Sequence, residues 1–404
     1  MAERNRHGLH AVREDEIKEI EQSSDFKAQI RSHRFKVFLR TIILIGALVG
    51  MIVGIVLYFR YRSYSDYEVQ SEYERTDTAA TLFEEYGEGL LKYSNDGAFY
   101  TTLDNTPIWN QTYEMEHPKA DIAERYVAIG DIGGTELYIL NEAGQQGKIS
   151  TVLPIYQFSI AAQGTIAVLL ADKNDYYLKL FDAAGNELAS GQLYVKNSGY
   201  PMALALAQDG KKLAIASINP TGNSVQSEIT FYNFGSVGQN EPDNIVGTFS
   251  YEDLVIAQMS FMNADTLAVF GDKEVQIYGG AEKPELKSTL PVDREIKSIF
   301  YNDTYFGLIF NNEDEENSRH LEIYDKHCKN ALNQDFQMDY QKVYFLKDNE
   351  VCLQNDYECK LIGMNGVERF SAQFDVPLIK IVEEYVGMYY TFVLEGKTQK
   401  VRLI

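Results

Sequence analysis

The sequence predicts an all-β chain, a β-propeller of eight blades preceded by a single transmembrane helix. Two observations lead to this prediction. Residues 41–59 are apolar and uncharged, and a strand-and-turn unit recurs about every 43 residues through the rest of the chain. Four-stranded propeller blades usually take about 40–45 residues, and a long β-sandwich or two unrelated β domains would not keep this period. Seven blades with an irregular first unit are the alternative.

The first expected element is a membrane helix over "TIILIGALVGMIVGIVLYF" (Thr41–Phe59), which contains no charge. At a rise of about 1.5 Å per residue it would be roughly 28 Å long, close to the ~30 Å hydrocarbon core of a bilayer. A signal peptide would be shorter and would end in a small-residue cleavage site, which is not present here. We therefore divide the chain into a cytoplasmic tail (1–40), the helix (41–59), a juxtamembrane segment (60–88) and a propeller ectodomain (89–404).

Flanking charge predicts the orientation of this helix. Five Lys and Arg residues lie in the twenty positions before it, whereas the segment after it mixes three Arg with four acidic residues. The positive-inside rule then places the N-terminus in the cytoplasm and the C-terminal domain outside the cell membrane. A sensor that signals through the helix is a further possibility, but the tail contains no recognisable output domain.

Three glycines in the helix suggest a contact between copies. Gly46, Gly50 and Gly54 are spaced at i, i+4 and i+8, so they share one helix face. A face of this kind lets a second helix approach closely, as in GxxxG dimers, although glycine is frequent in membrane helices generally. A homodimer formed through the anchor is therefore left open.

The repeat defines the remaining elements. Each unit contains a strand that ends in a large apolar residue, followed by a small or polar residue and a turn. These pairs are Leu103-Asp104, Leu140-Asn141, Phe181-Asp182, Tyr232-Asn233, Tyr278-Gly279, Tyr324-Asp325 and Ile362-Gly363, with an eighth strand at Gln399–Ile404. A second apolar strand lies 15–20 residues earlier in most units, for example Tyr126–Ile132 and Lys212–Ile218. Candidate first strands precede it, for example "IYQFSIA" (Ile155–Ala161).

The last unit lacks an outermost strand, because the chain stops at Ile404. The extended segment Tyr64–Tyr73 can supply that strand. A ring sealed by both ends of the chain would have no exposed sheet edge.

Charge and cysteine content exclude some classes. Residues 1–59 carry nine Lys and Arg against seven Asp and Glu, which leaves 28 against 52, a net charge of −24, for residues 60–404. A domain this acidic repels nucleic acid phosphates. The three cysteines are too few for a disulfide scaffold. A turn centred on Asn355-Asp356 would place Cys352 opposite Cys359, so either a disulfide or two reduced thiols on one side of a hairpin is expected.

The sequence offers no catalytic, cofactor-binding or metal-binding residues. His117, His320 and His327 are scattered and fit solvated loops, and no zinc, phosphate-loop or nucleophile-elbow spacing is present. The acidic loop Asn311–Ser318 lacks the ligand order of a calcium loop and is expected to be a solvated insertion. Glycoside hydrolysis needs two carboxylates roughly 5–10 Å apart. Residues 60–404 contain 52 acidic residues, so the sequence alone cannot show which pair would meet this requirement.

Three stretches carry a resemblance to a known family: Gly89–Met115, Val152–Leu170 and Ser198–Ser217. They resemble an uncharacterised family of clostridial single-pass membrane proteins, whose members share a domain of unknown function. The resemblance covers most of the chain and implies a Gram-positive setting, with no site residues to transfer. "GKKLAIAS" is similar to WD40-like blade strands and "LDNTPIWNQ" to quinoprotein-type blades, but Trp109 is the sole Trp, so no quinone site is inferred.

These features favour an interaction module that binds an envelope protein or a cell-wall polymer without catalysis. The alternative is an extracytoplasmic glycan hydrolase or lyase with carboxylates at the propeller axis. Convergent acidic side chains in an axial pocket would favour the enzyme.

Overall fold

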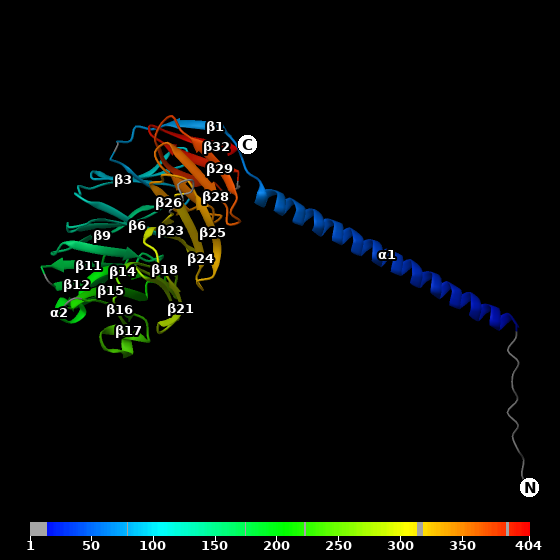
Figure 1. Cartoon of the computed structure of the whole chain (residues 1–404), viewed down its shortest axis with the longest axis horizontal. Helices are drawn as coiled ribbons and strands as arrows, with labels where there is room; N and C mark the ends of the chain where they lie inside the picture. The colour runs from blue at the N-terminus through cyan, green and yellow to red at the C-terminus, as the bar shows by residue number, and fades with distance from the viewer. Residues whose placement is uncertain (1–13, 79, 174, 222–223, 313–317, 385–387) are drawn as a thin grey trace, which may run out of the picture. The chain divides into compact units, whose positions relative to one another are not determined.

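The computed structural model describes residues 14–404 except 79, 174, 222–223, 313–317 and 385–387. The chain divides into two compact units, Met1–Arg62 and Ser63–Ile404. The first contains helix α1 (Glu14–Tyr61), and the second is built of β-sheets (Figure 1).

Helix α1 contains one stretch that is long and apolar enough to cross a membrane. This stretch is His33–Ile55, with a mean hydropathy of 2.4. It begins and ends earlier than the predicted 41–59, because the helix continues without a break from the charged tail into the apolar run. The protein thus has an N-terminal apolar helix that could be a transmembrane span.

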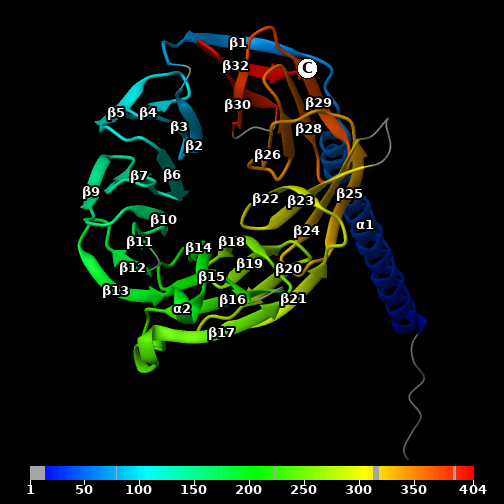
Figure 2. The same ribbon diagram turned by 60° about the vertical axis from the view of Figure 1, so that its left-hand side comes forward.

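The second unit is an eight-bladed β-propeller, which confirms the predicted fold and excludes seven blades. Its eight four-stranded antiparallel sheets are arranged around a central axis (Figure 2). Seven sheets use four consecutive strands, from the axis outwards: blade 1 has β2 (Leu82–Tyr86), β3 (Gly89–Ser94), β4 (Gly97–Thr102) and β5 (Pro107–Thr112); blade 2 has β6 (Pro118–Ala123), β7 (Tyr126–Asp131), β8 (Glu136–Asn141) and β9 (Gly144–Ser150); blade 3 has β10 (Ile155–Ile160), β11 (Ile166–Asp172), β12 (Asp175–Phe181) and β13 (Glu187–Tyr194); blade 4 has β14 (Tyr200–Leu206), β15 (Lys212–Thr221), β16 (Ser224–Asn233) and β17 (Ile245–Glu252).

The later blades follow the same plan. Blade 5 has β18 (Ile256–Asn263), β19 (Thr266–Gly271), β20 (Glu274–Gly279) and β21 (Glu285–Pro291); blade 6 has β22 (Ile296–Tyr301), β23 (Tyr305–Asn311), β24 (Arg319–Asp325) and β25 (Asn330–Phe336); blade 7 has β26 (Lys342–Phe345), β27 (Val351–Gln354), β28 (Glu358–Ile362) and β29 (Glu368–Gln373). The short helices α2 (Val195–Ser198), η1 (Gly238–Asn240) and η2 (Pro242–Asn244) lie in connections.

Blade 8 joins the two ends of the unit. It contains β30 (Leu378–Glu383), β31 (Tyr389–Leu394) and β32 (Lys397–Leu403), and its outermost strand is β1 (Tyr67–Glu74). The pairing of β1 with β32 is antiparallel and runs from Tyr67 opposite Leu403 to Glu74 opposite Lys397. The segment after α1 therefore closes the ring. Blade 1 starts at β2, so the propeller begins before residue 89, where the ectodomain boundary was placed.

The core lies between the blades rather than within any one of them. Each of the eight clusters of buried apolar side chains combines residues of two neighbouring blades. The second and third strands of a blade are packed on both faces, as in β7, where Val127, Ala128 and Ile129 are fully buried. This is why their sequences are continuous apolar runs without alternation. The outermost strands, such as β13, are mostly exposed.

The interface between blades 8 and 1 has the smallest apolar cluster. Among the described residues, its buried members are Phe83, Leu90, Val382 and Val393. A buried guanidinium compensates for this. Arg75 donates to Asp77 (2.5 Å), to the Thr398 hydroxyl (2.8 Å) and to the Leu394 carbonyl (2.7 Å), and it lies over the Phe83 ring at 4.8 Å. We call this arrangement the Arg75 clasp.

The prediction that Cys352 lies opposite Cys359 is wrong, because the two strands pair in a different register. The hairpin of β27 and β28 pairs Cys352 with Leu361 and Gln354 with Cys359, so the turn is centred one residue further along than expected. Both thiols are free and fully buried between blades 7 and 8. Burial raises the pKa of Cys352 to about 12, so its thiolate is absent at neutral pH.

We expect no cysteine-alkylating reagent to modify Cys352 or Cys359 in the folded protein at pH 8, because the reactive thiolate form is disfavoured and the sulfur atoms are inaccessible. After denaturation without reductant, both should be alkylated. Mass spectrometry of tryptic peptides checks this. A peptide pair still linked by a disulfide in the denatured, unreduced sample would contradict the prediction.

Candidate functional site

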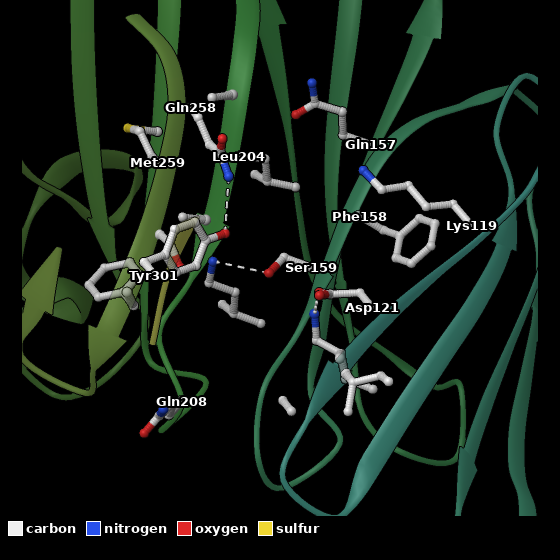
Figure 3. Close-up of a pocket in the computed structure, with 18 of the residues that line it drawn as sticks. Lys119, Asp121, Gln157, Phe158, Ser159, Leu204, Gln208, Gln258, Met259 and Tyr301 are labelled. Carbon is white, nitrogen blue, oxygen red and sulfur yellow. Dashed lines mark hydrogen bonds between the residues drawn. The ribbon is translucent and has the colours of Figure 1, made fainter. Parts of the chain in front are cut away.

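The innermost strands of blades 2 to 6 surround a cavity on the propeller axis, with a volume of about 420 Å³. We call it the axial cavity. Its walls are formed by β6, β10, β14, β18 and β22, and Figure 3 shows side chains of these strands converging on it. The polar side chains among its lining are Lys119, Asp121, Glu124, Gln157, Ser159, Gln208, Gln258, Ser260 and Tyr301.

The axial cavity is confined to one side of the axis. On the other side, Lys380 of blade 8 pairs with Glu84 of blade 1, and Lys347 of blade 7 pairs with Glu85 at 2.8 Å. These long side chains connect the inner strands of blades 7, 8 and 1, which do not line the cavity.

A β-bulge recurs in the inner strands around the cavity. In β10, β14, β18 and β22 the pairing with the second strand shifts near the start of the strand, at Tyr156, Met202, Ala257 and Lys297 respectively. A bulge changes which side chains face a given side of a strand. Directly after the bulge, β10 and β18 present Gln157 and Gln258 to the cavity.

Several of these polar groups join one blade to the next. Asp121 accepts the N–H of Ile160 at 2.8 Å, and Gln157 donates to the carbonyl of Met202 at 2.9 Å. Gln258 donates to the hydroxyl of Tyr301 at 3.2 Å (Figure 3). In Gln157 and Gln258 this bond uses only the N–H of the amide, and the carbonyl oxygen of the side chain can still accept a hydrogen bond.

Other polar groups of the cavity have no hydrogen-bond partner within the described part of the chain. These are the Lys119 ammonium, the Gln208 amide and the Ser260 hydroxyl. Lys119 is exposed to the cavity, opposite Tyr301 and Gln258 (Figure 3). The cavity therefore offers both donors and acceptors to a ligand.

The acidic groups of the cavity lie on one wall. Asp121 belongs to β6, and Glu124 directly follows that strand. Burial raises the pKa of the Asp121 carboxyl, although the Ile160 N–H and the Ser159 hydroxyl favour its ionised form. The facing wall, on β18 and β22, presents an amide, a hydroxyl and a phenol. Two carboxylates facing each other across a substrate, as glycoside hydrolysis needs, are not formed by these cavity residues.

The most strongly perturbed carboxylates lie elsewhere. Glu350 and Glu383 are 2% and 4% exposed and belong to blades 7 and 8. Burial, followed by the negative charge of Asp348, raises the pKa of Glu383 to about 8 and that of Glu350 to about 6. Arg369 pairs with Glu350, and the Tyr390 hydroxyl donates to Glu350 at 2.9 Å. Neither carboxylate lines the axial cavity.

An apolar rim lies near one mouth of the cavity. It consists of Val152, Tyr194, Tyr200 and Met202, which are 96%, 50%, 42% and 39% exposed. Val152 lies in the connection from blade 2 to blade 3, and Tyr194 and Tyr200 flank the connection from blade 3 to blade 4. All four residues thus lie on the face where the chain crosses between blades, which we call the crossover face. Met202 also lines the cavity.

Two side-chain contacts support the backbone next to the apolar rim. The rings of Tyr156 and Tyr176 pack edge to face at 5.2 Å, and the Tyr156 hydroxyl donates to the carbonyl of Pro201 at 3.2 Å. This bond connects blade 3 to blade 4 directly beside Tyr200 and Met202. The backbone that carries Tyr200 and Met202 is therefore held in place.

The three anchor glycines lie on α1, where nothing comes within 4 Å of the position a Cβ would take at Gly46, Gly50 or Gly54. Self-association through this helix remains a prediction.

The expectation of solvated loop histidines is wrong for His320. His320 lies on β24, half-buried, with its ring nitrogens 2.5 Å from Asp335 and 3.0 Å from Glu322. His320 belongs to a strand because β24 pairs with β23, where His320 lies opposite Phe310. This pairing could not be recognised from the sequence. His117 and His327 are exposed in loops. The residues searched contain no cluster of three metal-ligating side chains, and positions 313–317 of the acidic loop lie outside the described residues.

The cavity residues were not identified by sequence, although a signal existed. The stretch Ile155–Ala161 was recognised as a first strand, and it contains Gln157 and Ser159 in an otherwise apolar run. Polar residues in an inner strand are typical of a lined channel. Sequence could not show that those of five blades meet, because they are far apart along the chain.

Eight closed four-stranded blades around an axial cavity define a WD40-like β-propeller. Solved structures share this fold. The chain is similar to Sqt1 of Chaetomium thermophilum, with 11% identity over 83% of this chain and 98% of that one, at a TM-score of 0.54. It is similar to a chain in the complex of KlAtg21 with the coiled-coil of AgAtg16, with 13% identity, coverage of 74% and 100%, and a TM-score of 0.50. Such low identities show the fold alone.

The particular family follows from a family model that matches residues 60–403. The chain belongs to DUF5711, a family of unknown function. The resemblance to an uncharacterised family is thereby confirmed, and so is its WD40-like fold. No match is found among the curated proteins.

Proposed function

We propose that this protein is a non-catalytic interaction module, tethered to the cell membrane by α1, whose propeller binds an envelope partner outside the cytoplasm. The apolar rim is the observation that carries the proposal. Val152 is almost fully exposed, and Tyr194, Tyr200 and Met202 are exposed in the neighbouring connection and strands on the same crossover face. Exposed apolar side chains that gather on one face of a protein typically mark an interaction site.

The chemistry of the surface suits binding. Tyrosine supplies a large contact area with few rotatable bonds, and methionine adapts to irregular surfaces. The backbone that carries Tyr200 and Met202 is fixed by the Tyr156–Pro201 hydrogen bond, so little ordering free energy is lost when a partner docks. The net charge of −24 on residues 60–404 favours partners that are neutral or basic.

The setting of this function is also part of the proposal. The apolar span His33–Ile55 and the charge asymmetry around it support an anchor with a cytoplasmic N-terminus. The resemblance to clostridial membrane proteins supports a Gram-positive envelope. The enzymatic alternative has less support, because the cavity carboxylates share one wall and the perturbed pair Glu350 and Glu383 lies away from the cavity.

The test is quantitative affinity capture of the tagged full-length protein from native membranes, after mild crosslinking. We expect the double variant Val152→Glu/Tyr200→Glu to lose a stoichiometric partner at least tenfold, because two desolvated carboxylates would oppose docking. The matched control is Leu286→Glu, since Leu286 is 43% exposed but lies on β21 of blade 5, a strand that contributes no residue to the rim. Equal recovery with the double variant and the wild type would exclude the rim as the binding surface.

A further inference from the structure

The surface exposed in the axial cavity is mainly polar, so the cavity differs in chemistry from the apolar rim. Its polar groups come from five blades, and its volume of about 420 Å³ falls within the range of about 300–1,000 Å³ that is usual for small-ligand sites. The question is which chemical class of ligand these groups select.

The charges of the lining argue against an ionic ligand. The ionisable side chains that line the cavity are Lys119, Asp121, Glu124 and Tyr301, so one cation faces two carboxyls. None of the residues that line the cavity is an arginine, whose guanidinium commonly binds phosphate or carboxylate through two parallel hydrogen bonds. An anionic ligand would also enter against the net negative charge of the domain. A cation would meet the Lys119 ammonium.

The neutral groups of the lining present donors and acceptors side by side. Gln157 and Gln258 each use an amide N–H within the protein and keep a carbonyl oxygen, while Gln208 and Ser260 keep their full capacity. A hydroxyl group both donates and accepts, so a ligand with many hydroxyl groups can satisfy both kinds of partner. A purely apolar ligand would leave these groups desolvated and unpaired.

One aromatic ring is held rigidly at the cavity wall. Tyr301 stacks on Phe270 with a centroid distance of 5.8 Å and an interplanar angle of 18°, and its hydroxyl accepts from Gln258. It is 37% exposed. A ring supported in this way offers a flat apolar surface beside hydrogen-bonding amides. A sugar ring is complementary to this arrangement, because its carbon–hydrogen face can pack on the Tyr301 ring while its hydroxyl groups bind the amides.

We infer that the axial cavity binds a neutral carbohydrate, with a sugar ring against Tyr301 and its hydroxyls bound by the amides, Ser260 and Lys119. This rests on the proposed binding function and names one ligand class for it: the carbohydrate enters the cavity, and the apolar rim holds the adjoining part of the partner. No bond is made or broken in the ligand.

The test uses full-length protein in a zwitterionic detergent without a sugar head group, because a glycoside detergent would compete. The probes are tetramers of β-1,4-linked N-acetylglucosamine, β-1,4-glucose, α-1,4-glucose and β-1,4-xylose. Inositol hexaphosphate serves as a polyanion, and a neutral peptide of Gly, Asn and Ser as a polypeptide. Saturation-transfer NMR detects binding, and calorimetry measures Kd. We expect at least one tetramer to bind with a Kd below about 1 mM, which corresponds to about −4 kcal/mol.

Three variants test the assigned residues. Tyr301→Ala should weaken binding at least tenfold, whereas Tyr301→Phe should keep most of it, because the ring face remains. Lys119 is exposed, and no hydrogen bond or ion pair joins its ammonium to another described residue, although its charge favours the ionised form of Asp121. Lys119→Met should weaken binding about tenfold. Tyr73→Ala, at a tyrosine on β1 of blade 8 that is also 37% exposed, is the control.

The outcomes separate the two proposals. Binding of the peptide or the polyanion alone, no binding of any tetramer, or unchanged binding by both Tyr301→Ala and Lys119→Met would overturn the carbohydrate site. None of these results affects partner capture through Val152 and Tyr200. Loss of capture in the rim variant with unchanged sugar binding would support both sites, since neither Val152 nor Tyr200 lines the cavity.

Discussion

Replacing Arg75 by methionine should lower the free energy of unfolding by about 3 kcal/mol, the size expected when one partner of a buried ion pair is removed. Arg75 is 6% exposed, and its loss removes the donor to the Thr398 hydroxyl and the Leu394 carbonyl and leaves Asp77 with Lys92, at 3.3 Å, as its remaining cation. The loss falls on the interface between blades 8 and 1, which has the smallest apolar cluster, with four buried members among the described residues.

Thermal unfolding of the full-length protein measures this loss, and a decrease of about 4 °C in Tm is expected for a unit of this size. Arg402→Met is the matched control, because Arg402 is an exposed arginine on β32 of the same blade. Its effect should stay within about 0.5 kcal/mol. Equal shifts in Tm for the two variants would mean that the Arg75 clasp does not hold the ring closed.

The second large effect concerns Glu383 and depends on pH. Its pKa is raised to about 8 in the folded protein, against an ordinary value of about 4.5. Between these values the folded state binds more protons than the unfolded state, so stability falls as pH rises through this window and changes no further above it. Glu383→Gln removes the charge and keeps a donor for Asp348. We expect it to stabilise the protein by about 2 kcal/mol at pH 8.5 and not at pH 4.5.

The difference in Tm between Glu383→Gln and the wild type, followed from pH 4.5 to 8.5, is the measurement. Glu116→Gln serves as the control, because Glu116 is exposed in a loop. Its Tm difference should not depend on pH. A Glu383→Gln variant that is destabilised equally at both pH values would show that the carboxyl is not protonated in the folded protein.

These two predictions concern one region, the junction of blades 7, 8 and 1. The chain enters the propeller there: the N–H of Tyr64 donates to the carbonyl of Arg369 at 2.7 Å, and Arg369 pairs with Glu350. On the other side of the ring, blades 2 to 6 form the axial cavity and the apolar rim lies on blades 3 and 4. Closure and the proposed recognition are therefore assigned to different blades, so variants can separate them.

Sequence reasoning was most successful where the physical rule is local. Second strands such as Lys212–Ile218 were recognised because a strand packed on both faces must be apolar along its whole length. Closure by the segment after α1 could also be anticipated, since an unpaired edge strand is unfavourable. It was least successful where one residue of register decides the result, as for Cys352 and Cys359.

What the sequence determined by itself was the repeat and the apolar helix, because each depends on the order of residue types along the chain, whereas the structure decided between eight and seven blades. The tertiary structure alone decided the site. Lys119, Gln157, Gln258 and Tyr301 belong to four blades and meet only because the ring closes. The same holds for the raised pKa of Glu383, which requires burial beside Asp348. Proximity between distant segments and the loss of water around them follow from packing, which no short stretch of sequence encodes.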